Sequence, residues 1–237
     1  MILALDAGNT RIKWGLHDGV AWAARGALAL AEAEELATSI TAPPAAIVAA
    51  NVAGAEVARR IEAGLSRWGV PIRWVSAQAA QGGVINGYEN PQQLGADRWA
   101  ALIGARHLHA GASLVVNAGT ATTVDVLDAA GLFRGGLILP GFDLMRASLA
   151  RNTAQLPWSD GRYRDYPRNT ADAIVSGCLH AQAGAVERMF AALSGEGPAL
   201  CLLSGGAAGL LAPALRVPYR LVDNLVLEGL VRIAAAA

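Results

Sequence analysis

An acidic side chain between an apolar run and a glycine turn is the first candidate for chemistry in this sequence. Residues 2–5 are apolar and predict a buried strand, which Asp6 follows directly. A carboxylate there can hold a hydrated Mg²⁺ on nucleotide phosphates, because Mg²⁺ prefers oxygen ligands and keeps several of its waters. It can also form an Asx turn, which needs no ligand. Asn9, Thr10 and Lys13 favour the phosphate interpretation, because they add donors and a cation to the same turn.

The sequence Gly-Ala-Asp-Arg at residues 95–98 is a second candidate reaction centre. Phosphoryl transfer to an alcohol needs a group that orients the hydroxyl and accepts its proton, and Asp97 can do both. Arg98 can bind a carboxylate through two parallel hydrogen bonds. The same residues also fit an acidic residue that favours a helix N-terminus beside a surface arginine. Taken alone, these four residues leave both interpretations open.

The first glycine turn is repeated near the middle of the chain. Residues 114–123 again run from an apolar strand through a short polar side chain and Ala-Gly to hydroxyl residues, with Asn117 in the position of Asp6. Thr120 and the threonines after it could reach phosphates, although threonine is also a good strand residue. Ser-Gly-Gly at residues 204–206 could form a strand-to-helix turn that receives an adenine or a ribose. The repeated loop predicts two similar halves that close on one nucleotide.

Two strands must flank the first loop. Ile12, Trp14 and Leu16 alternate with polar or small residues, which predicts a half-buried strand, and Asp-Gly at residues 18–19 is a hairpin turn signal. The first phosphate loop therefore joins two strands of a hairpin, unlike the strand–loop–helix of a Walker-type site. A third strand follows within residues 20–30.

The remaining elements predict a duplicated α/β fold with mixed sheets flanked by helices, in two domains at residues 1–110 and 111–237. Each half runs as three strands, helix, strand, helix, strand, helix. The further predicted strands are 46–52, 71–75, 114–117, 122–127, 133–139, 200–203 and 219–222. The predicted helices are 31–40, 55–68, 94–109, 141–152, 170–193, a short one near 208, and 224–236, with long polar loops at 76–93 and 153–169.

Composition excludes several classes of partner. The 237 residues are 54% hydrophobic and 16% charged, which is far from a disordered composition. Nineteen basic residues balance nineteen acidic ones, so nothing favours nucleic acid or an anionic membrane. Cys178 and Cys201 lack metal or redox spacing and are expected to be buried thiols. Without a basic N-terminal region or a membrane-length apolar run, we expect a soluble cytoplasmic protein.

Taken together and in order, these motifs resemble the type III pantothenate kinases. The matching stretches are Asp-Ala-Gly-Asn-Thr at 6–10 with Lys13, Tyr-Glu-Asn-Pro-Gln-Gln-Leu-Gly-Ala-Asp-Arg-Trp at 88–99, Gly-Thr-Ala-Thr-Thr-Val-Asp at 119–125, Gly-Gly-Leu-Ile-Leu-Pro-Gly at 135–141, Asn-Thr at 169–170 and Ser-Gly-Gly at 204–206. They span nearly the whole chain, and they are specific as a set although each is weak alone.

The resemblance implies the actin, heat-shock ATPase and sugar kinase superfamily, with two ribonuclease-H-like halves. It implies ATP-dependent phosphorylation of pantothenate to 4'-phosphopantothenate, the first step of coenzyme A synthesis. Asp97 would be the catalytic base. The ATP-binding residues would be Asp6, Ala7, Gly8, Asn9, Thr10, Arg11, Ile12, Lys13 and Thr120, with Mg²⁺ held by Asp6 through water. The pantothenate-binding residues would be Tyr88, Gly95, Ala96, Asp97, Arg98 and Thr170. The resemblance also implies a homodimer with the substrate site at the interface, where Thr170 comes from the neighbouring subunit.

One departure concerns a monovalent cation, K⁺ or NH₄⁺. Many family members carry an aspartate where this chain has Asn117, and that aspartate helps to bind the cation. Asparagine keeps an oxygen ligand but loses the charge, so we expect a weakened cation site. Two other functions fit parts of the pattern: a non-catalytic nucleotide-binding regulator on the same fold, and a kinase of another small alcohol. The intact Gly-Ala-Asp-Arg sequence argues against the regulator.

Overall fold

The chain forms two compact units. The computed structural model describes residues 1–40, 43–153, 156, 158, 160–193, 195 and 197–236. The first unit comprises Met1–Ala110, Gly131–Phe133 and Asn224–Ala237, and the second comprises Gly111–Ala130 and Arg134–Asp223. Each unit has its own core of buried apolar side chains.

The first unit is built on a five-stranded mixed sheet. The strand order is β3-β2-β1-β4-β5, with β1 antiparallel to β2 and parallel to β4. The strands are β1 (Ile2–Ala7), β2 (Arg11–His17), β3 (Trp22–Ala29), β4 (Ala46–Asn51) and β5 (Ile72–Trp74), and the helices include α1 (Ala55–Leu65), the 3₁₀ turns η2 (Ser66–Trp68) and η3 (Pro91–Gln93), and α2 (Ala96–Leu108). As predicted, the first glycine turn joins two antiparallel strands.

The second unit repeats this arrangement. The second sheet has seven strands in the order β12-β11-β8-β9-β10-β7-β6, with β7 (Val84–Asn86) and β6 (Ala80–Gln81) at one edge; the other five strands repeat the strand order of the first sheet. They are β8 (Ser113–Ala118), β9 (Ala121–Leu127), β10 (Leu132–Pro140), β11 (Leu200–Ser204) and β12 (Tyr219–Leu221), and the helices are α3 (Phe142–Asn152), α4 (Thr170–Ala191), α5 (Ala208–Leu211) and the 3₁₀ turn η4 (Ala212–Ala214). The predicted α/β class, with two mixed sheets flanked by helices, is confirmed. Residues 154, 155, 157 and 159 of the predicted loop at 153–169 lie outside the described residues.

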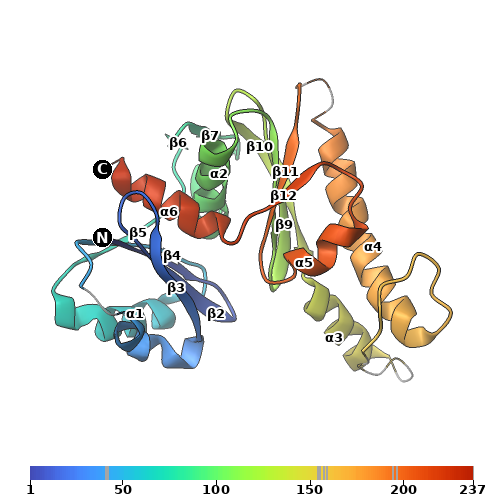
Figure 1. Cartoon of the computed structure of the whole chain (residues 1–237), viewed down its shortest axis with the longest axis horizontal. Helices are drawn as coiled ribbons and strands as arrows, with labels where there is room; N and C mark the ends of the chain where they lie inside the picture. The colour runs from blue at the N-terminus through green and yellow to red at the C-terminus, as the bar shows by residue number, and fades with distance from the viewer. Residues whose placement is uncertain are drawn as a thin grey trace. The chain divides into compact units, whose positions relative to one another are not determined.

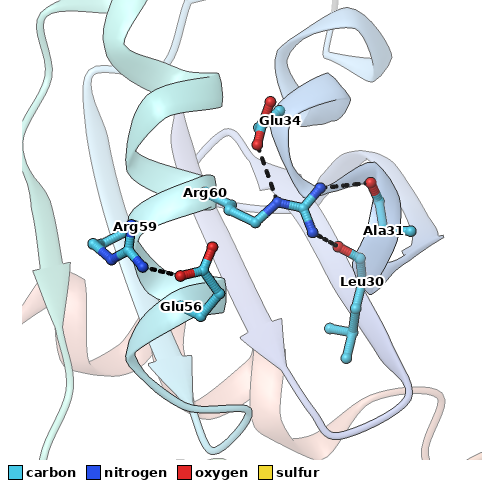
Figure 2. A network of polar contacts seen from close by, with 6 residues as sticks. All are labelled: Leu30, Ala31, Glu34, Glu56, Arg59 and Arg60. Carbon is cyan, nitrogen blue, oxygen red and sulfur yellow. Dashed lines mark hydrogen bonds and ion pairs between the residues drawn. The ribbon is translucent and has the colours of Figure 1, made fainter.

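The helix predicted at residues 31–40 is a 3₁₀ helix, η1 (Leu30–Ser39). Arg60 of α1 donates hydrogen bonds to the carbonyl oxygens of Leu30 (3.1 Å) and Ala31 (2.6 Å), and its Nε contacts Glu34 at 3.0 Å. Figure 2 shows this network beside the pair formed by Glu56 and Arg59. Arg60 binds the carbonyl oxygens at the start of η1, which would otherwise accept hydrogen bonds within an α-helix. These tertiary contacts outweigh the α-helical preference of an Ala/Glu-rich segment.

The long loop predicted at residues 76–93 contains a small hairpin. Strands β6 (Ala80–Gln81) and β7 (Val84–Asn86) are antiparallel, and β7 also pairs in parallel with Leu132 and Phe133. Gly82 and Gly83, between the strands, have φ angles of 59° and 78°. A two-residue turn with both φ angles positive suits glycine and matches the twist of a hairpin. The prediction of a long loop was therefore wrong for residues 80–86.

The C-terminal helix α6 (Leu225–Ala235) packs in the first unit, whereas the sequence places it with the second half. It crosses α2 (Figure 1), and at Gly229 a Cβ atom would lie 1.7 Å from the carbonyl oxygen of Ala100. The two helix backbones therefore touch, which only glycine permits there. No helix in the described part of the chain is long and apolar enough to cross a membrane.

Candidate active site

Asp6 and Lys13 face each other across the first hairpin. They are register partners on β1 and β2, so their side chains project from the same face of the sheet. The five residues Leu3–Ala7 are all buried, and Asp6 itself is only 7% exposed. A carboxylate in that setting needs a positive partner, and the nearby lysine supplies one.

The charge state of Asp6 depends on this environment. Burial raises the pKa of the Asp6 carboxyl from its usual 3.8 to about 6, while the charge of Lys13 lowers this pKa and the charge of Asp97 raises it. The effect of Asp97 means that a second carboxylate lies close to the first. The structure thus brings together two acidic residues that are 91 positions apart (97 − 6) in the sequence. Such a pair attracts a cation, because bringing two carboxylates together without one is unfavourable.

Asp97 is held at the start of α2. It is the second residue of the helix, and its Oδ1 accepts a hydrogen bond of 2.8 Å from the backbone N–H of Arg98. The helix N-terminus favours a negative charge at this position. A Cβ atom on Gly95 would lie 2.6 Å from that same Oδ1. Glycine at position 95 therefore leaves the space that the carboxylate occupies.

Arg98 is buried against two aromatic rings. Its Nη1 donates a 2.9 Å hydrogen bond to the hydroxyl of Tyr88, and its guanidinium carbon lies 5.6 Å and 5.8 Å from the ring centroids of Tyr88 and Phe133. Only 6% of Arg98 is exposed, so it is not the surface arginine of the alternative interpretation. Phe133 comes from β10 and carries no motif signal, so the sequence analysis missed it.

The residues of the first loop divide into two groups. Asn9, Thr10 and Arg11 are exposed, whereas Ala7 and Ile12 are fully buried and can offer a ligand only their backbone groups. The Gly8 N–H donates to the carbonyl of Arg11 at 3.1 Å. Gly8 does not have a positive φ, and a Cβ there would meet its nearest neighbour at an ordinary 3.6 Å. The fold itself therefore does not require glycine at position 8. Glycine would be required there if a ligand approached the backbone closely.

Glycine turns of the second unit converge on the end of β8. The Gly141 N–H donates to the carbonyl of Thr120 at 2.9 Å, and a Cβ on Gly141 would lie 2.1 Å from the carbonyl of Gly119. A Cβ on Gly205 would lie 2.4 Å from the carbonyl of Ala118. The repeated loop, the start of α3 and the Ser-Gly-Gly turn thus meet at one place.

Two further predicted residues, Asn117 and Thr170, also lie in the second unit. Asn117, near the end of β8, pairs with Thr123 of β9 and Ser204 of β11. Thr170 is exposed at the first position of α4 and lines a cavity of about 970 Å³ whose walls are mainly α3 and α4. Among the described residues, no three His, Cys, Asp or Glu side chains are grouped to hold a metal by themselves. Mg²⁺ needs no such group when it is bound by one or two carboxylates and the phosphates of a nucleotide.

The raised pKa of Asp6 predicts a stability cost near neutral pH. The folded state binds a proton up to about pH 6, whereas the unfolded chain releases it near pH 4, so wild-type stability falls as the pH rises between these values. Asp6→Asn mimics the protonated form. The variant should be more stable than the wild type by about 3 kcal/mol at pH 7.5 and equal to it below pH ~4 in urea unfolding.

Asp18→Asn provides a control of opposite sign in the next turn of the chain. Hydrogen bonds from the N–H groups of Ala21 and Val20 lower the pKa of the exposed Asp18. Ionised Asp18 therefore stabilises the folded state near neutral pH, and this stabilisation is lost in acid. The Asp18→Asn variant should be less stable than the wild type at pH 7.5. An Asp6→Asn protein that is no more stable than the wild type at pH 7.5 would contradict the burial argument.

Solved structures with a similar fold come from several functional classes. The chain matches a protein from Campylobacter jejuni described as a Baf family transcriptional activator, with a TM-score of 0.66, 18% identity and coverage of 99% of this chain and 98% of that one. It also matches the ROK hexokinase from Thermus thermophilus, with a TM-score of 0.54, 15% identity and coverage of 99% and 98%. At these identities the likeness shows the fold alone.

Sequence relatives are far closer. A protein of Aromatoleum aromaticum named type III pantothenate kinase is 60% identical over 99% of this chain and 98% of its own length. A protein of the same name from Azoarcus sp. is 57% identical over 100% of this chain and 91% of its own length. The family model for type III pantothenate kinase matches residues 2–192. The chain belongs to the type III pantothenate kinase family.

Proposed function

We propose that Asp97 is the base in the transfer of a phosphoryl group from ATP to the hydroxyl of pantothenate. The chain belongs to the pantothenate kinases, ATP-using enzymes that carry out the first step of coenzyme A biosynthesis. One observation carries the assignment of the base: Asp97 lies at a helix N-terminus, close enough to the buried Asp6 to raise its pKa. A metal–phosphate group held by Asp6 would then lie near the proposed proton acceptor.

The proposed step uses Asp97 on the acceptor. The hydroxyl oxygen of pantothenate forms a bond to the γ-phosphorus of ATP, the bond from that phosphorus to the bridging oxygen breaks, and ADP leaves. The hydroxyl proton passes to the Asp97 carboxylate. A carboxylate positioned beside the acceptor hydroxyl can act as a general base in this way.

Asp6 and Lys13 act on the donor side. When bound, Mg²⁺ would neutralise charge on the phosphates, and Asp6 would hold it through water, which fits one carboxylate with limited access. Lys13, opposite Asp6 on the same face, would contact the phosphates directly. The backbone of residues 7–12 and Thr120 complete the proposed ATP-binding set, and the exposure of Asn9 and Thr10 supports this.

Arg98 and Tyr88 would bind the carboxylate end of pantothenate, along with the backbone of Gly95 and Ala96. The hydrogen bond from Arg98 to Tyr88 supports this, because it fixes the guanidinium before the substrate arrives. A planar guanidinium is well suited to a carboxylate.

Replacing the proposed base provides the direct test. Asp97→Asn keeps the shape of the side chain but removes the proton acceptor, so kcat should fall about 10²- to 10⁴-fold while the affinity for ATP changes little. Coupled turnover assays and calorimetry measure the two quantities. Glu56→Gln is the control, because Glu56 also lies in the first turn of a helix, and it should keep wild-type activity. A wild-type kcat for Asp97→Asn would exclude the base role.

A monovalent cation, K⁺ or NH₄⁺, would bind near Asn117. The side chain offers one neutral oxygen, so we expect weak stimulation of the wild type by K⁺. Asn117→Asp restores a charge at that position and should lower the K⁺ concentration for half-maximal activity by about tenfold or more, because a charged ligand binds a cation much more tightly. Titrating activity with KCl, against tetramethylammonium chloride as the control, tests this. An unchanged K⁺ response in the variant would count against the site.

The enzyme is proposed to act as a homodimer in which Thr170 enters the substrate site of the partner. The cavity beside Thr170 is lined mostly by apolar side chains of α3 and α4. Leu144 of α3 is 45% exposed, and Ile138 of β10 is 66% exposed. Exposed apolar side chains beside an apolar cavity would fit burial against a partner subunit.

Mixing two inactive variants tests the shared site. Asp97→Asn and Thr170→Ala each impair every site of their own dimer. In a heterodimer, one site combines the native Asp97 of one chain with the native Thr170 of the other. Co-refolding equal amounts should therefore restore about a quarter of wild-type activity, since about half the dimers are mixed and each has one intact site. Activity that never exceeds the average of the two separate variants would show that Thr170 does not act across subunits.

A cytoplasmic location is also proposed. Cys178 and Cys201 are free and buried, and nothing links them in a disulfide. Free thiols are typical of reducing compartments.

A further inference from the structure

A buried asparagine beneath the Tyr88 loop has no role in the mechanism described so far. Asn86 is the last residue of β7 and is only 8% exposed. Its Nδ2 donates to the carbonyl oxygens of Gln78 and Pro91, both at 3.2 Å, and its Oδ1 accepts from the backbone N–H of Tyr88 at 3.1 Å. One side chain therefore ties the strand end to both ends of the 88–91 loop and to the segment before β6.

These contacts matter because the loop between them has no regular structure. Residues 87–90 form neither helix nor strand, and Glu89 and Asn90 are exposed. Without repeated backbone hydrogen bonds, such a segment depends on side-chain contacts for its conformation. The bond from the Tyr88 N–H to Asn86 fixes the backbone of the residue whose hydroxyl meets Arg98.

Phe133 also contacts both Tyr88 and Arg98. It is fully buried, and it is the register partner of Asn86 in the parallel pairing of β10 with β7. Its ring centroid lies 5.2 Å from that of Tyr88. A Cβ on Gly87 would lie 2.1 Å from the carbonyl oxygen of Phe133, so the start of the loop is pressed against β10. Arg98 is then enclosed by Tyr88 and Phe133.

We propose that Asn86 and Phe133 are positioning residues that hold Tyr88 and Arg98 ready to bind the carboxylate of the acceptor. This inference rests on the proposed function, in which Arg98 binds the carboxylate of pantothenate. Neither residue touches the reacting atoms. Their effect is to remove the cost of ordering the loop and the arginine when the substrate binds.

The test compares steady-state kinetics of the wild type and Asn86→Ala at saturating concentrations of the other substrate. KM for pantothenate should rise by about tenfold or more, because a misplaced binding group loses most of its effect. KM for ATP should stay within about twofold, because none of the side-chain hydrogen bonds of Asn86 described above goes to a proposed ATP-binding residue. An equal rise in both KM values, or no rise in either, would overturn the inference.

A second readout separates positioning from a merely structural role. The primary amide of pantothenate keeps the hydroxyl and the length of the substrate but lacks the charge. The wild type should prefer pantothenate to this amide by at least about tenfold in kcat/KM, and in Asn86→Ala the preference should fall by at least about fivefold, because a charge-assisted hydrogen bond is lost. A destabilised protein with an undisturbed Arg98 would keep the wild-type preference.

Trp22→Phe is the matched control. It removes one partly buried side-chain hydrogen bond, from Trp22 Nε1 to Glu228 at 2.7 Å, in the same unit but on the edge strand β3. It should lower the melting temperature without changing KM for pantothenate or the preference over the amide.

Phe133→Leu carries the test if Asn86→Ala does not fold. Leucine keeps most of the buried apolar volume but removes the ring beside Tyr88 and Arg98, so the same selective rise in KM for pantothenate is expected. A folded Phe133→Leu enzyme with wild-type KM values for both substrates would overturn the inference. Failure of the proposed role of Arg98 is a different result: the wild type itself would then not prefer pantothenate to its primary amide.

Discussion

The burial of the Asp6 carboxylate beside a second carboxylate is the constraint on which the site depends. Burial alone raises the pKa of Asp6, and the negative charge of Asp97 adds to this effect, while Lys13 opposes it. The arrangement costs folding energy that a neutral side chain at position 6 would not cost. A chain that keeps such a group where apolar packing would be more stable has a use for its charge. In the proposed mechanism, a cation carried by the nucleotide would balance the charge of both carboxylates.

Much of the surrounding structure serves this arrangement. The hairpin of β1 and β2 places Lys13 opposite Asp6, and the parallel strand β4 buries the other side of β1. Asp97 lies in the first turn of helix α2, where the helix dipole is positive, and Gly95 leaves room for its carboxylate. On the next residue, Arg98 turns into an aromatic enclosure instead of toward solvent. In the proposed mechanism, these consecutive residues of one helix accept the proton and bind the substrate carboxylate.

The features that could be predicted from the sequence were local in origin. Alternating apolar residues and the Asp-Gly turn predicted the first hairpin. The repeated element order predicted two similar sheets, and five strands in each follow the same order. Asp6, Lys13, Asp97 and Arg98 were recognised because their types and spacing carry chemistry. The structure brings these four into the first unit, while Asn117, Thr120 and Thr170 lie in the second.

The features that could not be predicted depend on contacts between distant segments. Arg60 of α1 donates hydrogen bonds to the start of η1, 26 to 30 residues earlier in the chain. Phe133 reaches Arg98 from β10, and α6 packs on α2 through the close approach of Gly229 to Ala100. Phe133, Gly229 and Asn86 are of residue types that are common in cores and turns, so nothing in the sequence marks them as contacts. The spacing of apolar residues predicts which face of a segment is buried, but it does not predict which other segment packs against that face.

Titrating the Asp6 carboxyl directly tests the central claim that the two carboxylates are neighbours in the folded protein. Carbon-13 NMR of labelled aspartate can follow this group between pH 4 and 8 in the wild type and in Asp97→Asn. The account predicts a pKa of about 6 in the wild type and a lower value, still above 3.8, when the charge of Asp97 is removed. A wild-type pKa near 3.8, or a raised pKa that Asp97→Asn leaves unchanged, would contradict it.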